Sequence, residues 1–396
     1  MNIAIYVSVG FNYKEGGIQT MSLLVCDIFK KLGHRVYFIS RAKELSPDFT
    51  INAEEEVYLP DPENVCSGRN AEFFTQYVRH HRIDMILCQF YPFFEDFATL
   101  PYLVKKATGV KVLYELHQTP NYHSLEIQDL SRPVMPSELT FVKEYKRITR
   151  LLRKSAKQKR RDQKMGDVLR RVHDMSDGVI LLSERFVDIF QRMTRIQDNS
   201  KLHVIHNPSI YAPDQIVKTE KKNVLLYVGR LAITKRPDRI LRIWAKIQHD
   251  FPDWTLKLVG EGICRTDLEW LIKRMDLQRC SLEGQKDPLQ EYREAKIFLL
   301  TSAFEGFPMV LLEAMQNGVV PVVFNSFAAV HDLIDADAQT GVLVDAFDMD
   351  QFAEKLSALM RDAERLERMS EAVKVKVGQF SSEHIAEEWQ QLLQQL

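Results

Sequence analysis

The densest group of residues that could do chemistry lies in the run FEGFPMVLLEAMQNGVVPVVF, residues 304–324. A predicted strand, Ile297 to Thr301, precedes this run, and Glu305 lies in the loop that follows the strand. Pro308 favours the first turn of a helix, whose N-terminus offers unpaired N–H groups and the positive end of a dipole. Glu313 lies about one and a half turns inside that helix and is expected to face the same cleft. The pattern suits a ligand with hydroxyl groups and negative charge.

A second group of charged residues follows another predicted strand, Val224 to Val228, in the run VGRLAITKRP. Gly229 and Arg230 come directly after the strand, and Lys235 precedes a helix opened by Pro237. Fixed cations at such a place stabilise negative charge that develops on a ligand during a reaction. The alternative is that these cations, like the two glutamates, are solvated surface charges.

The first half of the chain offers a glycine pair and a histidine, each after a predicted strand. Gly16 and Gly17 follow the strand Asn2 to Val9, and such a pair lets the backbone approach a phosphate or adopt dihedral angles closed to other residues. The run is not G-x-G-x-x-G, so the dinucleotide fingerprint is absent. His117 follows the strand KVLYEL, and its alternative role is that of a purely structural histidine.

The elements that must position these residues alternate along the chain. Short apolar, β-rich runs are each followed by a turn and an amphipathic helical stretch, which is the pattern of parallel βαβ units. Ligands of such sheets bind beyond the carboxyl ends of the strands, where the candidate residues lie. Further strands are expected at Val36 to Ser40, Met85 to Gln89, Gly178 to Leu182, His203 to Ile205, Thr255 to Val259 and Val319 to Phe324; further helices at Ile18 to Leu32 and Pro237 to Phe251.

The length of 396 residues favours two domains, because single hydrophobic cores stop growing at around 250 to 300 residues. Residues 207–222 combine Asn-Pro, Ala-Pro-Asp and a charged run, a composition typical of a linker. We therefore expect one Rossmann-like domain over 1–206 and a second Rossmann-like domain over 223–380. A C-terminal helix over 381–396 is expected to pack back across the hinge. The predicted fold is α/β, with two doubly wound domains facing across a cleft.

The spacing of Glu305 and Glu313, inside the frame E-G-F-P-x-V-x-x-E-A-x-x-x-G, resembles the family 4 retaining glycosyltransferases of the GT-B fold, also called glycosyl transferases group 1. Two glutamates alone would be weak support for this resemblance, but the frame around them is specific. The resemblance implies that Glu305 contacts hydroxyls of the donor sugar and that Glu313 contacts the nucleotide ribose. It also implies a backbone contact with the sugar and phosphate from Gly306, Phe307, Pro308, Met309 and Val310.

The same resemblance implies that the domain over 1–206 is the acceptor side and that the domain over 223–380 binds the nucleotide sugar. It also implies roles for the other candidates. Arg230 and Lys235 would bind the diphosphate, and Gly16 with Gly17 would form the glycine loop of the first domain. His117 would face the donor sugar near the reacting carbon. Of these residues, His117, Glu305, Arg230 and Lys235 are the predicted catalytic set.

The resemblance further implies a retaining, metal-independent transfer of a sugar from a nucleotide-diphosphate donor, a UDP-sugar above all, to a hydroxyl acceptor. The acceptor would be a sugar or a lipid-linked saccharide in bacterial surface polysaccharide or lipopolysaccharide assembly. No cofactor is expected besides the donor substrate. Two alternatives stay open: a sugar-nucleotide epimerase of the same fold, and a catalytically silent relative that binds a partner.

Two Asp-x-Asp sequences raise the question of a metal. Asp335 to Asp337 and Asp348 to Asp350 match the text pattern by which the other major glycosyltransferase fold holds a divalent cation. Both come after the glutamate pair, in predicted loop or helix-cap positions. We therefore predict no metal ligands, with the fixed cations and the helix N-terminus in place of the ion.

Composition excludes some classes of function. The formal net charge is −1, which gives no general signal for binding polyanions, and the five cysteines form no C-x-x-C pair. The start of the chain lacks a basic region ahead of a long apolar stretch, and no apolar run approaches the roughly 20 residues that cross a bilayer. The cytoplasm is the expected location.

One segment departs from this neutral background. Residues 143–171 carry thirteen Lys and Arg residues against three acids, with an apolar stripe in their first part. A basic helix of this kind can lie on an anionic membrane surface, here the inner face of the cell membrane. A solvated helix is the alternative, and nucleic-acid binding is disfavoured because aromatic residues are almost absent.

Overall fold

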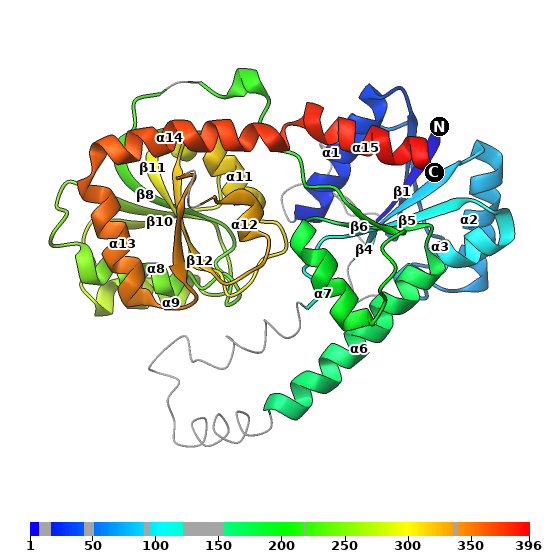
Figure 1. The fold of residues 1–396 in the computed structure, drawn as a ribbon, viewed down its shortest axis with the longest axis horizontal. Helices are drawn as coiled ribbons and strands as arrows, with labels where there is room; N and C mark the ends of the chain where they lie inside the picture. Colours follow the sequence, from blue (N-terminus) through cyan, green and yellow to red (C-terminus); the bar gives the residue numbers. More distant parts are fainter. Residues whose placement is uncertain (8–16, 43–50, 91–94, 122–153, 218, 336–338) are drawn as a thin grey trace. The chain divides into compact units, whose positions relative to one another are not determined.

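The structure is a computed structural model that describes residues 1–396 except 8–16, 43–50, 91–94, 122–153, 218 and 336–338 (Figure 1). The chain divides into two compact units. The N-terminal unit contains Met1–Asn121, Asp162–Pro208 and Phe380–Leu396, and the C-terminal unit is formed around Ser209–Gln379. Among the passages between the units, one follows Pro208 and another precedes Phe380.

The N-terminal unit holds a seven-stranded parallel sheet in the order β3-β2-β1-β4-β5-β6-β7. The order runs outward in both directions from β1 and β4, so the sheet is doubly wound. The strands are β1 (Asn2–Val7), β2 (Arg35–Ser40), β3 (Glu55–Tyr58), β4 (Met85–Phe90), β5 (Lys111–Leu116), β6 (Gly178–Leu181) and β7 (Leu202–Val204). The helices are α1 (Gly17–Lys31), α2 (Gly68–His81), α3 (Glu95–Thr108), α6 (Lys154–Met175), α7 (Glu184–Thr194) and α15 (Ser382–Gln395), of which α6 belongs to this unit from Asp162 onward.

Alternation along β1 shows how helices cover both faces of this sheet. Ile3 and Ile5 lie in a core cluster with residues of α1 and α15, while Tyr6 stacks on Phe97 of α3 with ring centroids 4.0 Å apart. Successive strand residues point to opposite faces, so a strand buried on both sides is apolar throughout. The C-terminal helix belongs to this core, because Trp389 is fully buried.

The C-terminal unit holds a six-stranded parallel sheet in the order β10-β9-β8-β11-β12-β13. Its strands are β8 (Lys222–Val228), β9 (Thr255–Val259), β10 (Cys280–Gly284), β11 (Ala295–Leu300), β12 (Val320–Asn325) and β13 (Val342–Asp345). Its helices are α8 (Pro237–Ile247), α9 (Arg265–Arg274), α10 (Leu289–Glu294), α11 (Met309–Gln316), α12 (Val330–Leu333), α13 (Met349–Arg361) and α14 (Ala363–Val377).

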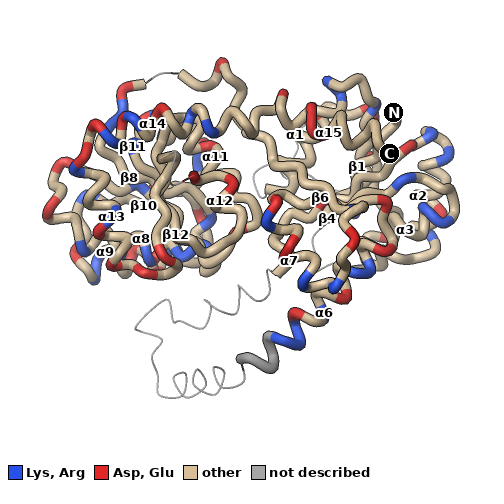
Figure 2. The backbone as a smooth tube through the Cα atoms, in the orientation of Figure 1, with Lys and Arg blue, Asp and Glu red and all other residues tan. Residues whose placement is uncertain are grey.

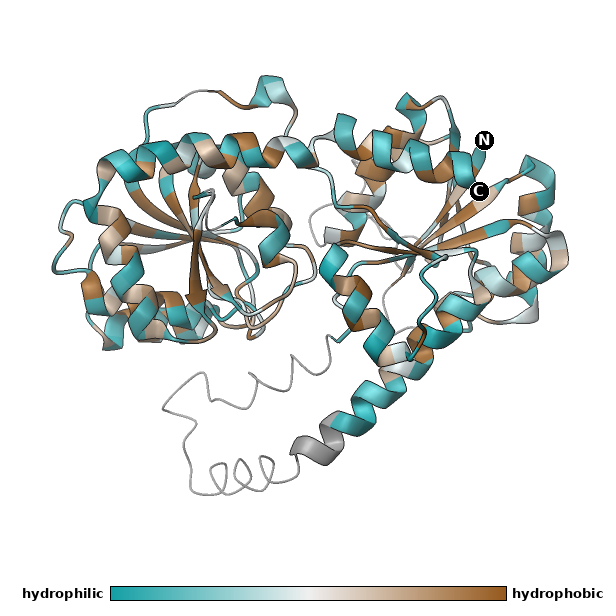
Figure 3. Ribbon diagram, viewed as in Figure 1, coloured by the Kyte–Doolittle hydropathy of each residue, from teal (hydrophilic) through white to brown (hydrophobic). Residues whose placement is uncertain are grey.

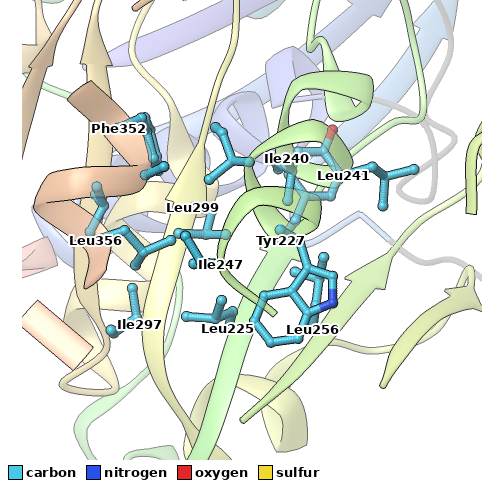
Figure 4. Packing of buried hydrophobic residues seen from close by; sticks show 14 of the residues in the cluster. Leu225, Tyr227, Ile240, Leu241, Ile247, Leu256, Ile297, Leu299, Phe352 and Leu356 are labelled. Carbon is cyan, nitrogen blue, oxygen red and sulfur yellow. The ribbon is translucent and has the colours of Figure 1, made fainter. Parts of the chain in front are cut away.

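One face of this second sheet packs against α8, α9 and α13. Figure 4 shows Leu225 and Tyr227 of β8 beside Ile240 and Leu241 of α8, with Phe352 of α13 in the same cluster. Hydrophobic residues run along the strands of both sheets, and the outer faces of the helices are hydrophilic (Figure 3). The expected fold, two doubly wound parallel α/β domains, is confirmed within each unit.

Most expected strands are present with ends shifted by one or two residues, and the expected helices begin within two residues of their predicted starts. Three edge strands were not predicted: β3, β10 and β13. Their sequences, EEVY, CSLEG and VLVD, are short and carry polar residues, because an edge strand is only partly covered. The helix predicted over Pro237 to Phe251 ends earlier, at Ile247.

In the part of the chain that the structure describes, no helix is long and apolar enough to cross a membrane. The basic segment predicted over 143–171 is described only from α6 onward, and its first part lies outside the described residues. Figure 2 shows Lys and Arg along α6. Lys159, Arg160, Arg161 and Lys164 are exposed, whereas Met165 and Leu169 further along the helix are buried.

Candidate active site

The C-terminal sheet reverses its strand order between β8 and β11, which are hydrogen-bonded neighbours. In open α/β sheets the loops that leave two such strands diverge, and the crevice between them is the usual ligand site. Here the loop after β8 carries Arg230 and Lys235, and the loop after β11 carries Glu305. Arg230, Lys235 and Glu305, three of the residues singled out in the sequence, therefore lie at this switch point.

The structure brings Lys235 and Glu305 into direct contact. The Lys235 ammonium donates to both carboxylate oxygens of Glu305, at 2.7 and 2.6 Å. Ser302 Oγ donates to the same carboxylate at 2.6 Å. The Glu305 side chain is only 8% exposed and that of Lys235 is 25% exposed, so the pair is partly shielded from water. Charge-assisted hydrogen bonds of this length hold both groups in fixed positions.

The two loops are tied together beneath this ion pair. Ala303 N–H donates to the Thr234 carbonyl at 2.9 Å, and the Thr301 hydroxyl donates to the Arg236 carbonyl at 2.9 Å. Arg236 itself has a positive φ of 51° at the N-cap of α8. Its buried guanidinium donates to both oxygens of Asp238, each at 2.8 Å. These buried bonds fix the separation of the loops that carry Lys235 and Glu305.

Glu313 occupies a more apolar place. Its side chain is buried within α11 and accepts a hydrogen bond from the Tyr292 hydroxyl at 2.9 Å. Burial raises the pKa of Glu313 to about 7, while the bond from Tyr292 acts in the opposite direction. Near neutral pH its carboxyl group can therefore be ionised, and accept hydrogen bonds from a ligand, or be protonated, and donate one.

Glu313 should make stability depend on pH. Because its folded pKa of about 7 exceeds the usual 4.5, its contribution to stability is complete below about pH 4.5 and is lost as pH rises through 7. A Glu313→Gln variant lacks this loss, so its unfolding free energy relative to wild type should rise by roughly 3 kcal/mol between about pH 4.5 and pH 8. Denaturant unfolding of both proteins, followed by tryptophan fluorescence, measures the difference. Parallel stability curves would contradict the raised pKa.

Arg230 is exposed at the start of the loop after β8, and its backbone carbonyl accepts from the Tyr227 hydroxyl at 2.9 Å. The loops after β8 and β9 are in backbone contact: Gly229 N–H donates to the Val259 carbonyl at 3.0 Å, and Leu231 N–H to the Glu261 carbonyl at 2.8 Å. The Arg230 side chain thus extends from a rigid turn into solvent, where an anion can reach it.

Gly306 to Val310 lead from the loop into α11. Gly306, Phe307 and Pro308 are buried, and Met309 and Val310 form the partly exposed first turn of the helix. Pro308 is the N-cap residue, one position earlier than expected, and no side chain caps the helix there. The Leu311 N–H donates to the Pro308 carbonyl at 3.0 Å, so the N–H groups of Met309 and Val310 are the ones that can meet an anion.

In the N-terminal unit, His117 directly follows β5 and is 7% exposed. Its Nε2 is hydrogen-bonded to Oε1 of Gln89 on β4, and Nε2 of Gln89 lies 2.9 Å from the carboxylate of Glu115. Burial lowers the pKa of His117 to about 3, so the imidazole is neutral at physiological pH. Burial also raises the pKa of Glu115 to about 7.

The glycine pair is described only in part, because Gly16 lies outside the described residues. Gly17 is the first residue of α1 and has no positive φ, so dihedral freedom is not what a glycine provides there. A Cβ at Gly17 would meet no atom within 4 Å, which leaves open space at this end of α1.

The structure also shows what some of the aspartates in the two Asp-x-Asp sequences do. Asp348 is the N-cap residue of α13 and accepts from the N–H groups of Asp350 and Gln351. Asp350 lies 2.7 Å from the Lys246 ammonium, and Asp337 lies outside the described residues. Within the described ranges, no group of three or more His, Cys, Asp or Glu residues is arranged to hold a metal ion.

Several residues of these sites were missed in the sequence. Gln89, Ser302 and Tyr292 bond directly to His117, Glu305 and Glu313. Ser302 and Gln89 both lie at the carboxyl end of a predicted strand, a position that could have drawn attention to them. Tyr292 lies on α10, and its distance of 21 residues from Glu313 left no local signal.

Comparison with known proteins places this architecture in a class. Each unit holds a doubly wound parallel sheet with polar residues at the ends of its strands, and a pair of such units matches the GT-B fold. The structure aligns over all of both chains with the apo form of the lipopolysaccharide outer core galactosyltransferase WaaB (TM-score 0.71, 17% identical). It aligns equally completely with Anabaena Alr3699/HepE in complex with UDP (TM-score 0.72, 16% identical).

Two family models match nearly the whole chain. The model for Glycosyltransferase Family 4 matches residues 15–208, and that for Glycosyl transferases group 1 matches residues 212–376. The chain belongs to this glycosyltransferase family, as the frame around Glu305 and Glu313 indicated.

Curated relatives match over part of their length. An uncharacterized glycosyltransferase of Haemophilus influenzae is 27% identical over 219 residues, 55% of this chain and 61% of the relative. The GalNAc-alpha-(1->4)-GalNAc-alpha-(1->3)-diNAcBac-PP-undecaprenol alpha-1,4-N-acetyl-D-galactosaminyltransferase of Campylobacter jejuni is 29% identical over 175 residues, 44% of this chain and 48% of the relative. The matched region thus spans about half to three fifths of these proteins.

Proposed function

We propose that this protein transfers a sugar from a nucleotide-diphosphate donor to a hydroxyl acceptor, with retention of anomeric configuration. The observation that carries the proposal is the bonded pair of Lys235 and Glu305 at the switch point of the C-terminal sheet. A carboxylate suits sugar hydroxyls and a cation suits a diphosphate, and here the two lie side by side. Family membership supports the same reading.

Each site residue has a role in this proposal. Glu305 binds hydroxyls of the sugar, and Glu313 binds the ribose. Arg230, Lys235 and the first turn of α11 stabilise the negative charge that grows on the leaving diphosphate. That diphosphate helps to deprotonate the acceptor hydroxyl as the glycosidic bond of the donor breaks on the same face.

UDP is the proposed nucleotide, and a saccharide of the bacterial surface, free or lipid-linked, is the proposed acceptor. The structure of HepE in complex with UDP supports the nucleotide. The printed names of the Campylobacter relative and of WaaB, which concern an undecaprenol-linked glycan and lipopolysaccharide, support the acceptor class. The enzyme would act in the cytoplasm, at the inner face of the cell membrane.

A thermal-shift screen tests the donor. Any ligand that prefers the native state stabilises the protein, by about 2.7 kcal/mol when its concentration is 100 times its Kd. This stabilisation raises the melting temperature. We expect UDP and at least one UDP-sugar to raise the melting temperature of the wild type. The Lys235→Ala variant should show no such rise. Stabilisation by no nucleotide sugar, whether UDP- or GDP-linked, would count against the proposal.

Chelation should leave turnover unchanged. We propose that fixed cations and the α11 N-terminus supply the positive charge that a divalent ion supplies in other transferases. Turnover with saturating donor is measured before and after dialysis against EDTA. A loss that Mg²⁺ or Mn²⁺ restores would return the Asp-x-Asp sequences to consideration.

The exposed cations of α6 are proposed to bind an anionic membrane surface that carries the acceptor. Each contributes about 1 kcal/mol near such a surface before screening by salt. Replacing four exposed cations of α6 with glutamine should weaken sedimentation with phosphatidylglycerol vesicles at low salt and spare turnover of a short soluble acceptor. The four are Lys159, Arg160, Arg161 and Lys164.

A matched control removes four exposed cations of the C-terminal unit instead. These are Lys273, Arg274, Arg361 and Arg368. Equal weakening by both variants would mean that only total charge matters. A wild-type protein that ignores these vesicles at low salt would leave α6 as a solvated helix.

A further inference from the structure

A buried chain of three polar side chains crosses the carboxyl ends of β4 and β5. Gln89 and Glu115 are register partners on these neighbouring parallel strands, so their side chains share one face of the sheet. Their exposed fractions are 0% and 2%, and that of His117 is 7%. Polar groups buried to this extent are costly unless their hydrogen bonds are made.

The carboxylate determines which way the Gln89 amide lies. An ionised Glu115 can only accept hydrogen bonds, so the group of Gln89 that lies 2.9 Å from it must be the donating NH₂. The carbonyl oxygen of Gln89 is thereby directed to Nε2 of His117. The orientation of an amide is ordinarily ambiguous, but above about pH 7, where Glu115 is ionised, its charge decides the orientation of Gln89.

The amide in turn determines the tautomer of His117. A carbonyl oxygen only accepts, so Nε2 of His117 must carry the hydrogen. Burial keeps the imidazole neutral, and a neutral ring carries one N–H hydrogen. Nδ1 is therefore left with a lone pair, and among the described residues nothing donates a hydrogen bond to it.

We propose that Gln89, oriented by Glu115, is a positioning residue that holds His117 as the Nε2–H tautomer and so offers Nδ1 as a hydrogen-bond acceptor to a sugar hydroxyl. Only the use of Nδ1 rests on the function proposed above. An atom that can only accept selects a ligand with a hydroxyl at that place, because a group without a hydrogen would leave Nδ1 unpaired.

The tautomer is measured directly. Long-range ¹H–¹⁵N spectra of protein labelled with ¹⁵N-histidine distinguish the two neutral tautomers, and a His117→Asn variant identifies the signals of His117 among the eleven histidines. The spectra are recorded at about pH 8.5, where Glu115 is ionised. We expect His117 to be neutral and protonated on Nε2. Protonation on Nδ1, or a doubly protonated ring, would overturn the proposal whatever the enzyme's activity.

Gln89→Met tests the cause, because methionine has a similar volume and neither donates nor accepts strongly. We expect His117 to become a mixture of tautomers and kcat/KM for the nucleotide sugar to fall by about twofold or more, in proportion to the lost Nε2–H tautomer. Gln248→Met, the same change at a buried glutamine of the C-terminal unit, is the control and should alter neither. An unchanged tautomer in Gln89→Met would overturn the positioning role.

Glu115→Gln provides a second variant if Gln89→Met does not fold. A neutral amide at position 115 no longer forces the orientation of Gln89, so the same mixture of tautomers is expected. A wild-type spectrum in this variant would overturn the role given to Glu115. An altered tautomer with unchanged kcat/KM would overturn the role of Nδ1 in sugar binding and leave the transferase proposal standing.

Discussion

Glu305→Ala and Lys235→Ala should each lower kcat by on the order of 10²-fold or more while the protein remains folded. The two side chains lie at the carboxyl edge of the C-terminal sheet and contribute nothing to its apolar core. Removing Glu305 takes away the carboxylate for the sugar, and removing Lys235 takes away a cation for the leaving diphosphate. Steady-state kinetics with saturating donor and acceptor measure the loss, and circular dichroism checks the fold.

A second lysine–glutamate pair in the same unit provides the control. Lys222 and Glu294 lie 2.8 Å apart at the opposite end of β8, and the lysine side chain is 62% exposed. Glu294→Ala should leave kcat within twofold of wild type, since exposed ion pairs contribute about 0–1 kcal/mol. Turnover close to wild type in either site variant would show that the pair does not serve catalysis.

Gly260→Ala should destabilise the C-terminal unit and remove donor binding with it. Gly260 follows β9 with a φ of +138°, and an added Cβ would lie 2.0 Å from the Gly229 carbonyl oxygen. The unfavourable φ and the clash with backbone together cost at least about 2 kcal/mol. We expect a melting temperature lower by roughly 5 °C or more. The displaced loop is the one that carries Arg230, so affinity for UDP should fall as well.

Gly378→Ala is the matched control for this effect. Gly378 lies at the end of α14 with an ordinary negative φ, and a Cβ there would meet nothing within 4 Å. Its replacement should leave the melting temperature and UDP affinity unchanged. If Gly260→Ala behaves in the same way in a scan of thermal unfolding and in calorimetry with UDP, the loops after β8 and β9 do not depend on their close contact.

The sequence predicted the sheets well because their strands are buried on both faces and read as continuous apolar runs. Val224 to Val228 is an example. The edge strand β3 escaped prediction because EEVY is half polar and lacks that contrast. The local sequence pattern thus predicts the central strands of a parallel sheet far better than its edge strands.

The candidate site was predictable where it is local in sequence and hidden where it is not. Glu305 and Glu313 share one loop and one helix, so their spacing was visible. The contact of Lys235 with Glu305 joins residues 70 positions apart, and it depends on β8 and β11 being neighbours. The partnership of Gln89 with His117 depends likewise on the pairing of β4 with β5. Periodicity does not encode such pairings.

The central claim, that the protein is a glycosyltransferase, is tested most directly by following the release of UDP from a UDP-sugar that stabilises the protein. The release is measured with and without a panel of saccharide acceptors, using wild type and Glu305→Ala. The account predicts release that depends on the acceptor, with a product one sugar longer, and its loss in the variant. Conversion of the UDP-sugar without acceptor would indicate an epimerase instead. Binding without turnover on any acceptor would indicate a silent relative, and either result would contradict the account.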